Sequence, residues 1–334
     1  MAEWSCSGLQ LRVHRFDSVL SLQLMKILVT GSSGFIGFHL VNILLNSGHK
    51  VVGIDDNNDY YNPKLKLERL TLLNSKNFTF YESDINDLAV AEKNFDLAIN
   101  LAAQAGVRVP KEKKYLYEHS NIEGFKSFCN FCKRVKIDKI LYASSSSVYA
   151  DVNDSKFCEI STPLSPKSLY GKSKLANEIY ASELIKTDDL SLVGLRFFSV
   201  YGPFGRPDMA YYAFTKAIKE QKKINLNNNG NMYRDMTFID DIIDGILRAM
   251  DYIVKPENKN KNEIFNLGND VPIKVSNMLH KLEHMIGKKA LVKPTLTENE
   301  TLKTHADITK AKNLLGYDPK IDFNEVIESI KILV

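Results

Sequence analysis

The sequence predicts an α/β fold with a doubly wound parallel sheet and a smaller, interleaved C-terminal domain. Short apolar runs with strand character alternate with helical segments from Met25 to about Gly202. The first run ends in a cluster of glycines, and beyond Gly202 the loops become polar and rich in asparagine. Strands that alternate with helices form βαβ units, whose right-handed crossovers place helices on both faces of one parallel sheet.

Each expected element follows from its apolar pattern. KILVT is a short apolar run that ends in glycines, and FIGFHLVNILLNSG follows it with helical spacing. Leu175, Ile179 and Leu184 give a later helix one apolar face. The expected strands cover 26–30, 50–56, 95–103, 139–147, 190–202 and 263–268. The expected helices cover 35–48, a polar stretch before residue 95, 168–185, 238–250 and 276–287.

A change in loop composition after Gly202, rather than a linker, indicates the second domain. Polar, Asn-rich loops occur at 225–231 and 255–262, between apolar segments. Residues 1–24 contain Arg12, Arg15 and other charges that interrupt a signal core, and we expect an extension with little part in the fold. The expected first domain comprises 25–198 and 235–270, and the expected second domain comprises 199–234 and 271–334.

The composition excludes several classes of function. The net charge is +4 and no basic tract with interleaved aromatics occurs, so nucleic acid is not an expected partner. No run of 18 uncharged apolar residues exists, so no membrane span is expected. Four cysteines in 334 residues indicate a reducing, cytoplasmic compartment without a disulfide framework. Cys129 and Cys132 form a C-x-x-C without a second pair, and we expect buried helix residues and no metal site.

The glycines of GSSGFIG (31–37) stand between the first strand and the first helix. Gly31 permits the tight turn, Gly34 lets the backbone approach a pyrophosphate, and Gly37 lets the helix pack closely on the strand, as in the Rossmann fold. A plain glycine turn has similar spacing, so the motif alone is a weak indication. Asp55 closes the next strand, where a carboxylate binds both ribose hydroxyls of NAD and repels the extra phosphate of NADP. Together these features predict an NAD site.

SLYGKSK (168–174) sets Tyr170 and Lys174 four residues apart, so both side chains share one face of the expected helix. A free phenol has a pKa near 10 and is a poor base at neutral pH. An ammonium about 5 Å away would contribute roughly 3 kcal/mol at an effective dielectric of 20, which lowers the phenol pKa by about two. A surface Tyr–Lys pair has the same spacing. The serine-rich end of the strand 139–147, at the sheet edge where α/β folds bind ligands, favours a catalytic pair.

The GxxGxxG spacing, the serine strand and the Tyr-x-x-x-Lys pair together resemble the extended short-chain dehydrogenase/reductase family. The resemblance gives Tyr170 the role of acid and base. It implies that Lys174 binds the nicotinamide ribose and also lowers the pKa of the phenol. It makes Ser145 the hydroxyl that hydrogen-bonds the reacting sugar oxygen and shuttles its proton.

The same resemblance extends the cofactor site. Asp84 and Ile85 match the family position beside the adenine, and LAAQAG (101–106) matches the strand end that lines the NAD pocket. The implied NAD-binding residues are Gly31, Gly34, Phe35, Ile36, Gly37, Asp55, Asp84, Ile85, Leu101, Ala102, Ala103, Gln104, Tyr170 and Lys174.

A finer resemblance runs from about Met25 to the end of the chain. NLAAQAGVR, YASSSSVYA, LYGKSKLANE, GLRFFSVYGPFGRPDMA and YRDMTFIDDIIDGI are all similar to stretches of UDP-glucuronate 4-epimerases. The resemblance implies a UDP-sugar substrate, a 4-keto intermediate and a homodimer. Arg206 suits a substrate carboxylate because its guanidinium forms a charge-assisted fork, and Arg234 matches the residue that holds the diphosphate. The implied substrate-binding residues are Arg108, Ser145, Ser199, Arg206 and Arg234.

Alternatives stay open at this point. SSSSVYA lacks the carboxylate that sugar dehydratases and UDP-glucuronate decarboxylases carry there, which favours epimerisation over a lyase reaction. Asn100 stands where the family has histidine, Val109 and Pro110 replace Tyr-Ser, and Ala150 replaces glycine. These departures leave another UDP-hexose or an N-acetylated sugar open as the substrate. A non-catalytic NAD-sensing protein is the least expected reading, because the tyrosine and the lysine are both present.

Overall fold

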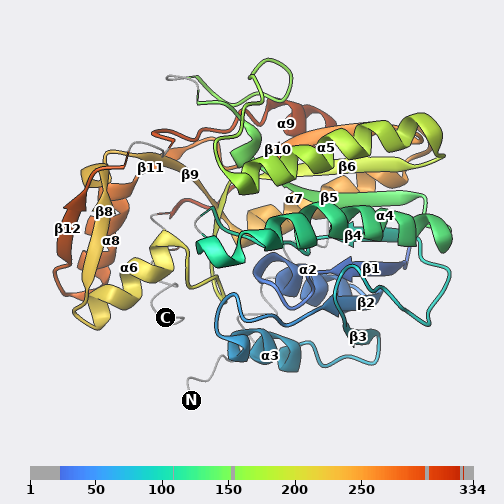
Figure 1. Cartoon of the computed structure of the whole chain (residues 1–334), viewed down its shortest axis with the longest axis horizontal. Coiled ribbons are helices and arrows are strands. Elements are labelled where there is room, and N and C mark those ends of the chain that lie inside the picture. The colour runs from blue at the N-terminus through green and yellow to red at the C-terminus, as the bar shows by residue number, and fades with distance from the viewer. Residues whose placement is uncertain (1–22, 108, 152–154, 298–300, 324–325, 327–334) are drawn as a thin grey trace.

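The computed structural model describes residues 23–107, 109–151, 155–297, 301–323 and 326. Its centre is a seven-stranded sheet in the order β10-β6-β5-β4-β1-β2-β3, in which all neighbouring strands are parallel (Figure 1). The strand order reverses at β1, which lies between β2 and β4, and α/β sheets bind ligands at such a switch point. The strands are β1 (Lys26–Thr30), β2 (Lys50–Asp55), β3 (Phe78–Glu82), β4 (Leu97–Asn100), β5 (Lys139–Ser145), β6 (Ser191–Phe197) and β10 (Asn262–Leu267).

Helices cover both faces of this sheet, so the predicted doubly wound fold is confirmed. In Figure 1, α4 and α5 lie in front of the sheet while α2 and α7 lie behind it. The connection from β2 to β3 contains α3, and α9 packs against α7 and β10. The helices are α2 (Phe35–Asn46), α3 (Pro63–Leu72), α4 (Gly124–Arg134), α5 (Leu169–Thr187), α7 (Ile239–Val254) and α9 (Thr309–Leu315).

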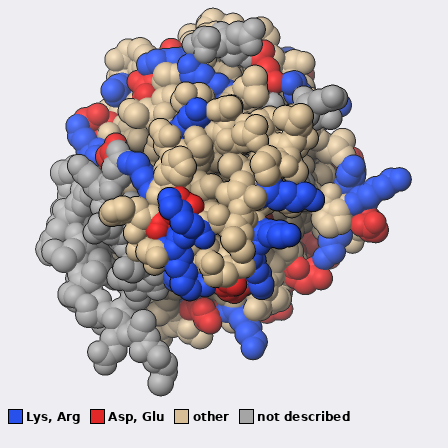
Figure 2. Space-filling model, turned by 90° about the vertical axis from the view of Figure 1, so that its left-hand side faces the viewer, with Lys and Arg blue, Asp and Glu red and all other residues tan. Residues whose placement is uncertain are grey.

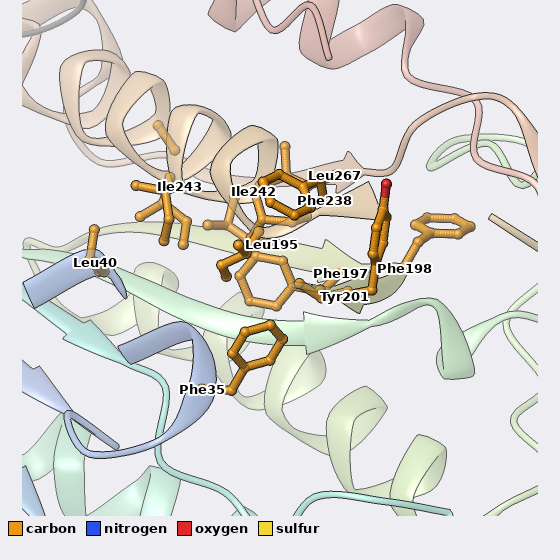
Figure 3. Packing of buried hydrophobic residues seen from close by; sticks show 14 of the residues in the cluster. Phe35, Leu40, Leu195, Phe197, Phe198, Tyr201, Phe238, Ile242, Ile243 and Leu267 are labelled. Carbon is orange, nitrogen blue, oxygen red and sulfur yellow. The ribbon is translucent and has the colours of Figure 1, made fainter. Parts of the chain in front are cut away.

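The strands are apolar on both faces because each face has its own core. In β1, Ile27 and Val29 belong to the cluster under α2 and α7, while Leu28 belongs to the cluster under α4 and α5. This alternation follows from the two-residue period of a strand. Figure 3 shows the first cluster, in which Leu195 of β6 packs near Ile242 of α7.

The smaller region contains two further sheets and lies at the left in Figure 1. β7 (Ser199–Tyr201) runs parallel to β9 (Tyr233–Phe238), and β11 (Pro272–Lys274) is antiparallel to β9. The second sheet pairs β8 (Lys223–Asn227) with β12 (Leu291–Thr295), flanked by α6 (Ala210–Lys219) and α8 (Val275–Ile286). On the face in Figure 2, Lys and Arg side chains surround an uncharged centre, with Asp and Glu among them.

One apolar core runs through both regions. Tyr201 and Phe238, which belong to β7 and β9, lie in the same cluster as Leu195 and Leu267 of the large sheet (Figure 3). The chain leaves the large sheet after β6 and returns to it with β10. The predicted division into two domains therefore stays a prediction, and the extension over 1–24 lies almost entirely outside the described residues.

Several expected elements differ in detail. The single strand expected over 190–202 is two strands, because Phe198 separates β6 in the large sheet from β7 in the smaller one. β3 was not expected, since as an edge strand it has no fully buried residue and no clear apolar pattern. The sequence predicts Ile179 on the apolar face of its helix, but the side chain is 56% exposed, whereas Leu184 of the same trio is buried.

Cys129 and Cys132 are buried in α4, as predicted, and burial raises the pKa of the Cys129 thiol to about 12. Both thiols are therefore inert near neutral pH. No group of three His, Cys, Asp or Glu side chains that could hold a metal ion occurs within the described ranges. Of the helices in the described part of the chain, none is long and apolar enough to cross a membrane.

Candidate active site

A cavity of about 1550 Å³ lies between the large sheet and the smaller region. Thr30, Asp55 and Ser145 reach it from the carboxyl ends of three parallel strands. Asn227 and Met278 line it from the smaller region. Its position at the switch point is the one that α/β folds use for nucleotide ligands.

The glycine loop forms a close turn at one end of the cavity. Gly31 has a φ of +72°, and a Cβ at this position would lie 2.6 Å from the backbone nitrogen of Ala102. A Cβ on Gly37 would lie 2.0 Å from the carbonyl oxygen of Gly31, so α2 begins directly against the turn. The free N–H groups at the start of this helix form an anion site that suits a pyrophosphate. The wall here consists of Gly31, Gly34, Phe35, Ile36 and Gly37.

Asp55 lies at the end of β2 and is only 7% exposed. Its carboxylate accepts hydrogen bonds from the backbone N–H of Ser33 (3.2 Å) and of Asn57 (3.0 Å), and from the Lys66 ammonium (3.2 Å). A carboxylate has about four acceptor positions, so one is left for a ribose hydroxyl, whereas the sequence predicts contacts with both hydroxyls. Lys66 was not predicted, because a lysine in a polar helix belongs to no motif. Its burial and its place in the cavity wall make it a candidate ribose contact.

Of the two residues expected beside the adenine, one lines the cavity and one does not. Ile85 lines the cavity, whereas Asp84 does not. The Asp84 carboxylate instead lies 2.8 Å from Nε2 of His119 and accepts a 2.8 Å hydrogen bond from the N–H of Asn86. The expected segment after β4 lines the cavity with Leu101, Ala102, Ala103 and Gln104. The glycine turn, the buried carboxylate and this segment together fit a dinucleotide.

Tyr170 and Ser145 meet where α5 begins against the end of β5. The Ser168 hydroxyl caps α5 by accepting the Gly171 N–H at 3.0 Å. A Cβ on Gly171 would lie 2.2 Å from the carbonyl oxygen of Ser147, so the helix contacts the serine segment without a side chain between them. This close packing brings the Tyr170 phenol within hydrogen-bonding reach of Ser145.

Lys174 lies under Tyr170 but does not bond to its phenol. Its ammonium is 6.0 Å from the centre of the Tyr170 ring and donates to the carbonyl oxygen of Ala143 at 2.9 Å. Burial lowers the pKa of Lys174 to about 8. Both residues line the cavity.

The predicted lowering of the Tyr170 pKa by Lys174 is wrong for this structure. Burial raises the pKa of Tyr170, and the main influences that lower it are the charge of Arg206 and the hydrogen bond with Ser145. Burial lowers the pKa of Lys174 itself to about 8, so the lysine has lost its positive charge before the buried phenol ionises. The cation that lowers the Tyr170 pKa is therefore Arg206, which lies on the loop between β7 and α6, and not Lys174 on the same helix as the phenol.

Most of the predicted substrate-binding residues line the cavity. Ser199, Arg206 and Arg234 line it. The Arg206 guanidinium forms a fork with Asp208, in which Nε is 3.0 Å from Oδ1 and Nη2 is 2.6 Å from Oδ2. Arg234 donates to the carbonyl oxygen of Tyr233 at 2.9 Å. The predicted contact Arg108 lies outside the described residues.

A buried ion pair supports the serine segment from behind. Glu178, one turn after Lys174 on α5, pairs with Arg196 of β6 at 2.7 Å and accepts the Ser144 hydroxyl. Arg196 also donates to the Tyr149 hydroxyl at 2.7 Å. The network joins β6 to α5, which carries Tyr170 and Lys174, and to β5, which carries Ser145. No sequence motif indicates this network, since its members lie far apart along the chain.

Comparison with known proteins identifies the family of this chain. The model of the NAD dependent epimerase/dehydratase family matches residues 27–268. The chain belongs to this family. It is an isomerase of the extended short-chain dehydrogenase/reductase type, and its cofactor is NAD.

Individual relatives have narrower descriptions. UDP-glucuronate 4-epimerase 4 of Arabidopsis thaliana is 41% identical over 317 residues, which cover 89% of this chain and 72% of the relative. Protein CapI of Staphylococcus aureus is 39% identical and covers 80% of this chain and 85% of its own length. The crystal structure of UDP-glucuronic acid 4-epimerase from Bacillus cereus, in complex with UDP-glucuronic acid and NAD, matches with a TM-score of 0.84. It has 34% identity and covers 91% of this chain and 97% of that one.

Proposed function

We propose that the protein interconverts UDP-glucuronate and UDP-galacturonate as an NAD-dependent 4-epimerase. One observation carries the choice of sugar: the Tyr170 phenol, the Ser145 hydroxyl and the Arg206 guanidinium line one cavity, and the phenol is influenced both by the hydroxyl and by the guanidinium charge. In a hexuronate, the carboxylate is attached to C5, next to the carbon that reacts. A cation beside the catalytic phenol therefore suits a sugar that has its charge beside its reacting hydroxyl.

The chain's own groups account for the proton transfers. Tyr170 accepts the proton of the C4 hydroxyl, directly or through Ser145, and later returns it to the same oxygen. The charge of Arg206 and the hydrogen bond with Ser145 favour the phenolate against the effect of burial. NAD+, held by the glycine turn, Asp55 and the segment 101–104, would supply the redox chemistry as acceptor and donor of the C4 hydride.

The remaining residues hold the substrate while the sugar turns. Arg234 binds the diphosphate, and Ser199 lies beside it, so that the nucleotide stays in place as the sugar ring rotates. The segment 144–147 presents serine hydroxyls and no carboxylate, which supports epimerisation over loss of water or carbon dioxide. Because the hydride that leaves C4 returns to the same carbon, the reaction needs no net reductant.

The test is the product formed from UDP-glucuronate by the purified protein. We expect a product of unchanged mass whose NMR spectrum has the C4 hydroxyl inverted. A product lighter by carbon dioxide or water would replace the proposal with a lyase, and no conversion of UDP-glucuronate together with conversion of a neutral UDP-sugar would replace the substrate. Tyr170→Phe should abolish turnover while NAD still binds, and retained full activity would reject the role of this phenol.

We also propose a cytoplasmic homodimer. The exposed apolar side chains Leu169 (46%) and Ile179 (56%) on α5 support a contact between two copies through this face of the sheet. Light scattering tests the dimer, and a monomer at micromolar concentration would contradict it. Cys129, Cys132 and Cys158 are free thiols, which supports a reducing compartment.

A further inference from the structure

The loop after β2 reaches across the cavity to the loop that carries Arg206. The Tyr60 hydroxyl donates a 3.0 Å hydrogen bond to Oδ2 of Asp208, which lies 148 residues away in the sequence. Asp208 is the carboxylate that accepts the Arg206 fork. The Arg206 guanidinium carbon also lies 6.0 Å from the centre of the Tyr60 ring. Tyr60, Asp208 and Arg206 therefore form one connected group, and all three line the cavity.

The position of the Tyr60 hydroxyl is closely defined by its surroundings. Gly106 has a φ of +83°, and a Cβ there would lie 2.2 Å from the Tyr60 hydroxyl oxygen. The carbonyl oxygen of Gly106 accepts the Tyr117 hydroxyl at 2.6 Å, which holds this backbone in place. Glycine at position 106 thus leaves the space that the tyrosine needs to reach Asp208.

A second connection fixes the backbone of the arginine loop independently of Tyr60. Arg69 of α3 is fully buried, and its guanidinium donates to the carbonyl oxygens of Phe204 (2.6 Å) and Ser33 (2.9 Å). The His39 ring also contacts the carbonyl oxygen of Pro203 at 2.9 Å. Because these bonds hold the loop backbone, loss of the Tyr60 hydroxyl should free the Asp208 and Arg206 side chains without displacing the loop.

We propose that Tyr60 is a positioning residue for the sugar site: through Asp208, it orients Arg206 toward the carboxylate of the substrate. The inference rests on the proposed function, in which Arg206 binds that carboxylate. A carboxylate that is held by a third donor presents its remaining lone pairs in a fixed direction, so the guanidinium bonded to it keeps one orientation. Fixing the orientation beforehand reduces the entropy lost on binding and so raises affinity.

The role predicts an effect on charged sugars alone. UDP-glucuronate uses Arg206 through its carboxylate, whereas UDP-glucose has a neutral hydroxymethyl group at the same carbon. A loosened Arg206 should therefore weaken the binding of the first and leave that of the second nearly unchanged. A general structural defect would weaken both.

The experiment measures the Kd of UDP-glucuronate and of UDP-glucose by calorimetry for the NAD-bound protein, in a Tyr170→Phe background that prevents turnover. Addition of Tyr60→Phe should raise the Kd of UDP-glucuronate about 5- to 10-fold and that of UDP-glucose less than about twofold. Tyr115→Phe is the matched control, because Tyr115 is 65% exposed and lies outside the site. It should change neither Kd.

The route through Asp208 is tested by a double-mutant cycle. In an Asp208→Asn background, Tyr60→Phe should have less than about a twofold further effect on the Kd of UDP-glucuronate. An undiminished effect there, an equal loss for both sugars, or no loss at all would each overturn the inference. If the wild-type protein converts UDP-glucuronate and one of these results is found, only this inference falls. If the wild-type protein does not convert it, the proposed function falls too.

Discussion

The tight packing of Gly37 against the glycine turn allows a prediction with a defined size. In Gly37→Ala, the new Cβ would lie 2.0 Å from the carbonyl oxygen of Gly31. An ordinary carbon–oxygen contact is about 3.4 Å, so the helix start or the turn must move by about 1.4 Å. Such overpacking should cost about 1–3 kcal/mol of unfolding free energy. It should also remove at least one hydrogen bond to the charged pyrophosphate, worth about 1.5–3 kcal/mol, or roughly 10- to 150-fold in NAD affinity.

Calorimetric titration with NAD and urea unfolding measure the two effects separately. Gly34→Ala is the matched control, because its Cβ would lie 3.0 Å from the same oxygen, with its next neighbour 3.9 Å away. Gly34 lines the cavity, so we expect this variant to lose NAD affinity with less than about 1 kcal/mol of stability. Wild-type stability and NAD affinity in Gly37→Ala would refute the reasoning.

The remaining predictions concern the buried charges. Burial lowers the pKa of Lys174 to about 8 from its ordinary value of 10.5, so between these two pH values the unfolded chain binds more protons than the folded one. The unfolding free energy of the wild type, measured relative to Lys174→Met, should therefore rise from pH 8 to pH 10, and a flat or falling difference would contradict this. Glu178→Ala leaves the Arg196 guanidinium buried without its carboxylate, which should cost about 3–5 kcal/mol in urea unfolding. Glu183→Ala, which removes an exposed ion pair on the same helix, should cost less than about 0.5 kcal/mol, and equal losses in the two variants would be evidence against the reasoning.

The parts of the site that could be predicted are encoded in short stretches of sequence. The glycine turn needs three glycines at fixed spacing, and a helix places residues four apart on one face. The local pattern therefore selects Gly31, Gly37, Tyr170 and Lys174 as candidates, and all four line the cavity. The doubly wound arrangement of the sheet follows in the same way from the alternation of strand and helix with right-handed crossovers.

The parts that could not be predicted depend on contacts between distant segments. Tyr60 and Asp208 are bonded across 148 residues, and neither belongs to a local pattern. Lys66 lies in a polar helix, and only the fold shows that it is buried against Asp55. The strand over 190–202 has one continuous apolar pattern, so the change of sheet at Phe198 leaves no signal in it.

The Tyr170 pKa illustrates the same limit in energetic terms. The spacing of Tyr170 and Lys174 fixes their shared helix face but not the burial of the ammonium, which lowers the pKa of Lys174 to about 8. The charge that offsets burial comes from Arg206, whose loop is remote in sequence. Electrostatic effects of this kind depend on distances that only the tertiary structure defines.

The central claim is that the C4 hydrogen leaves as a hydride and returns to the same carbon, while Tyr170 moves only the hydroxyl proton. The most direct measurement uses UDP-glucuronate with deuterium at C4 in ordinary water, followed by mass spectrometry and NMR of the product. The account predicts UDP-galacturonate that keeps the deuterium at C4. Deuterium lost to the solvent, with inversion still observed, would contradict it.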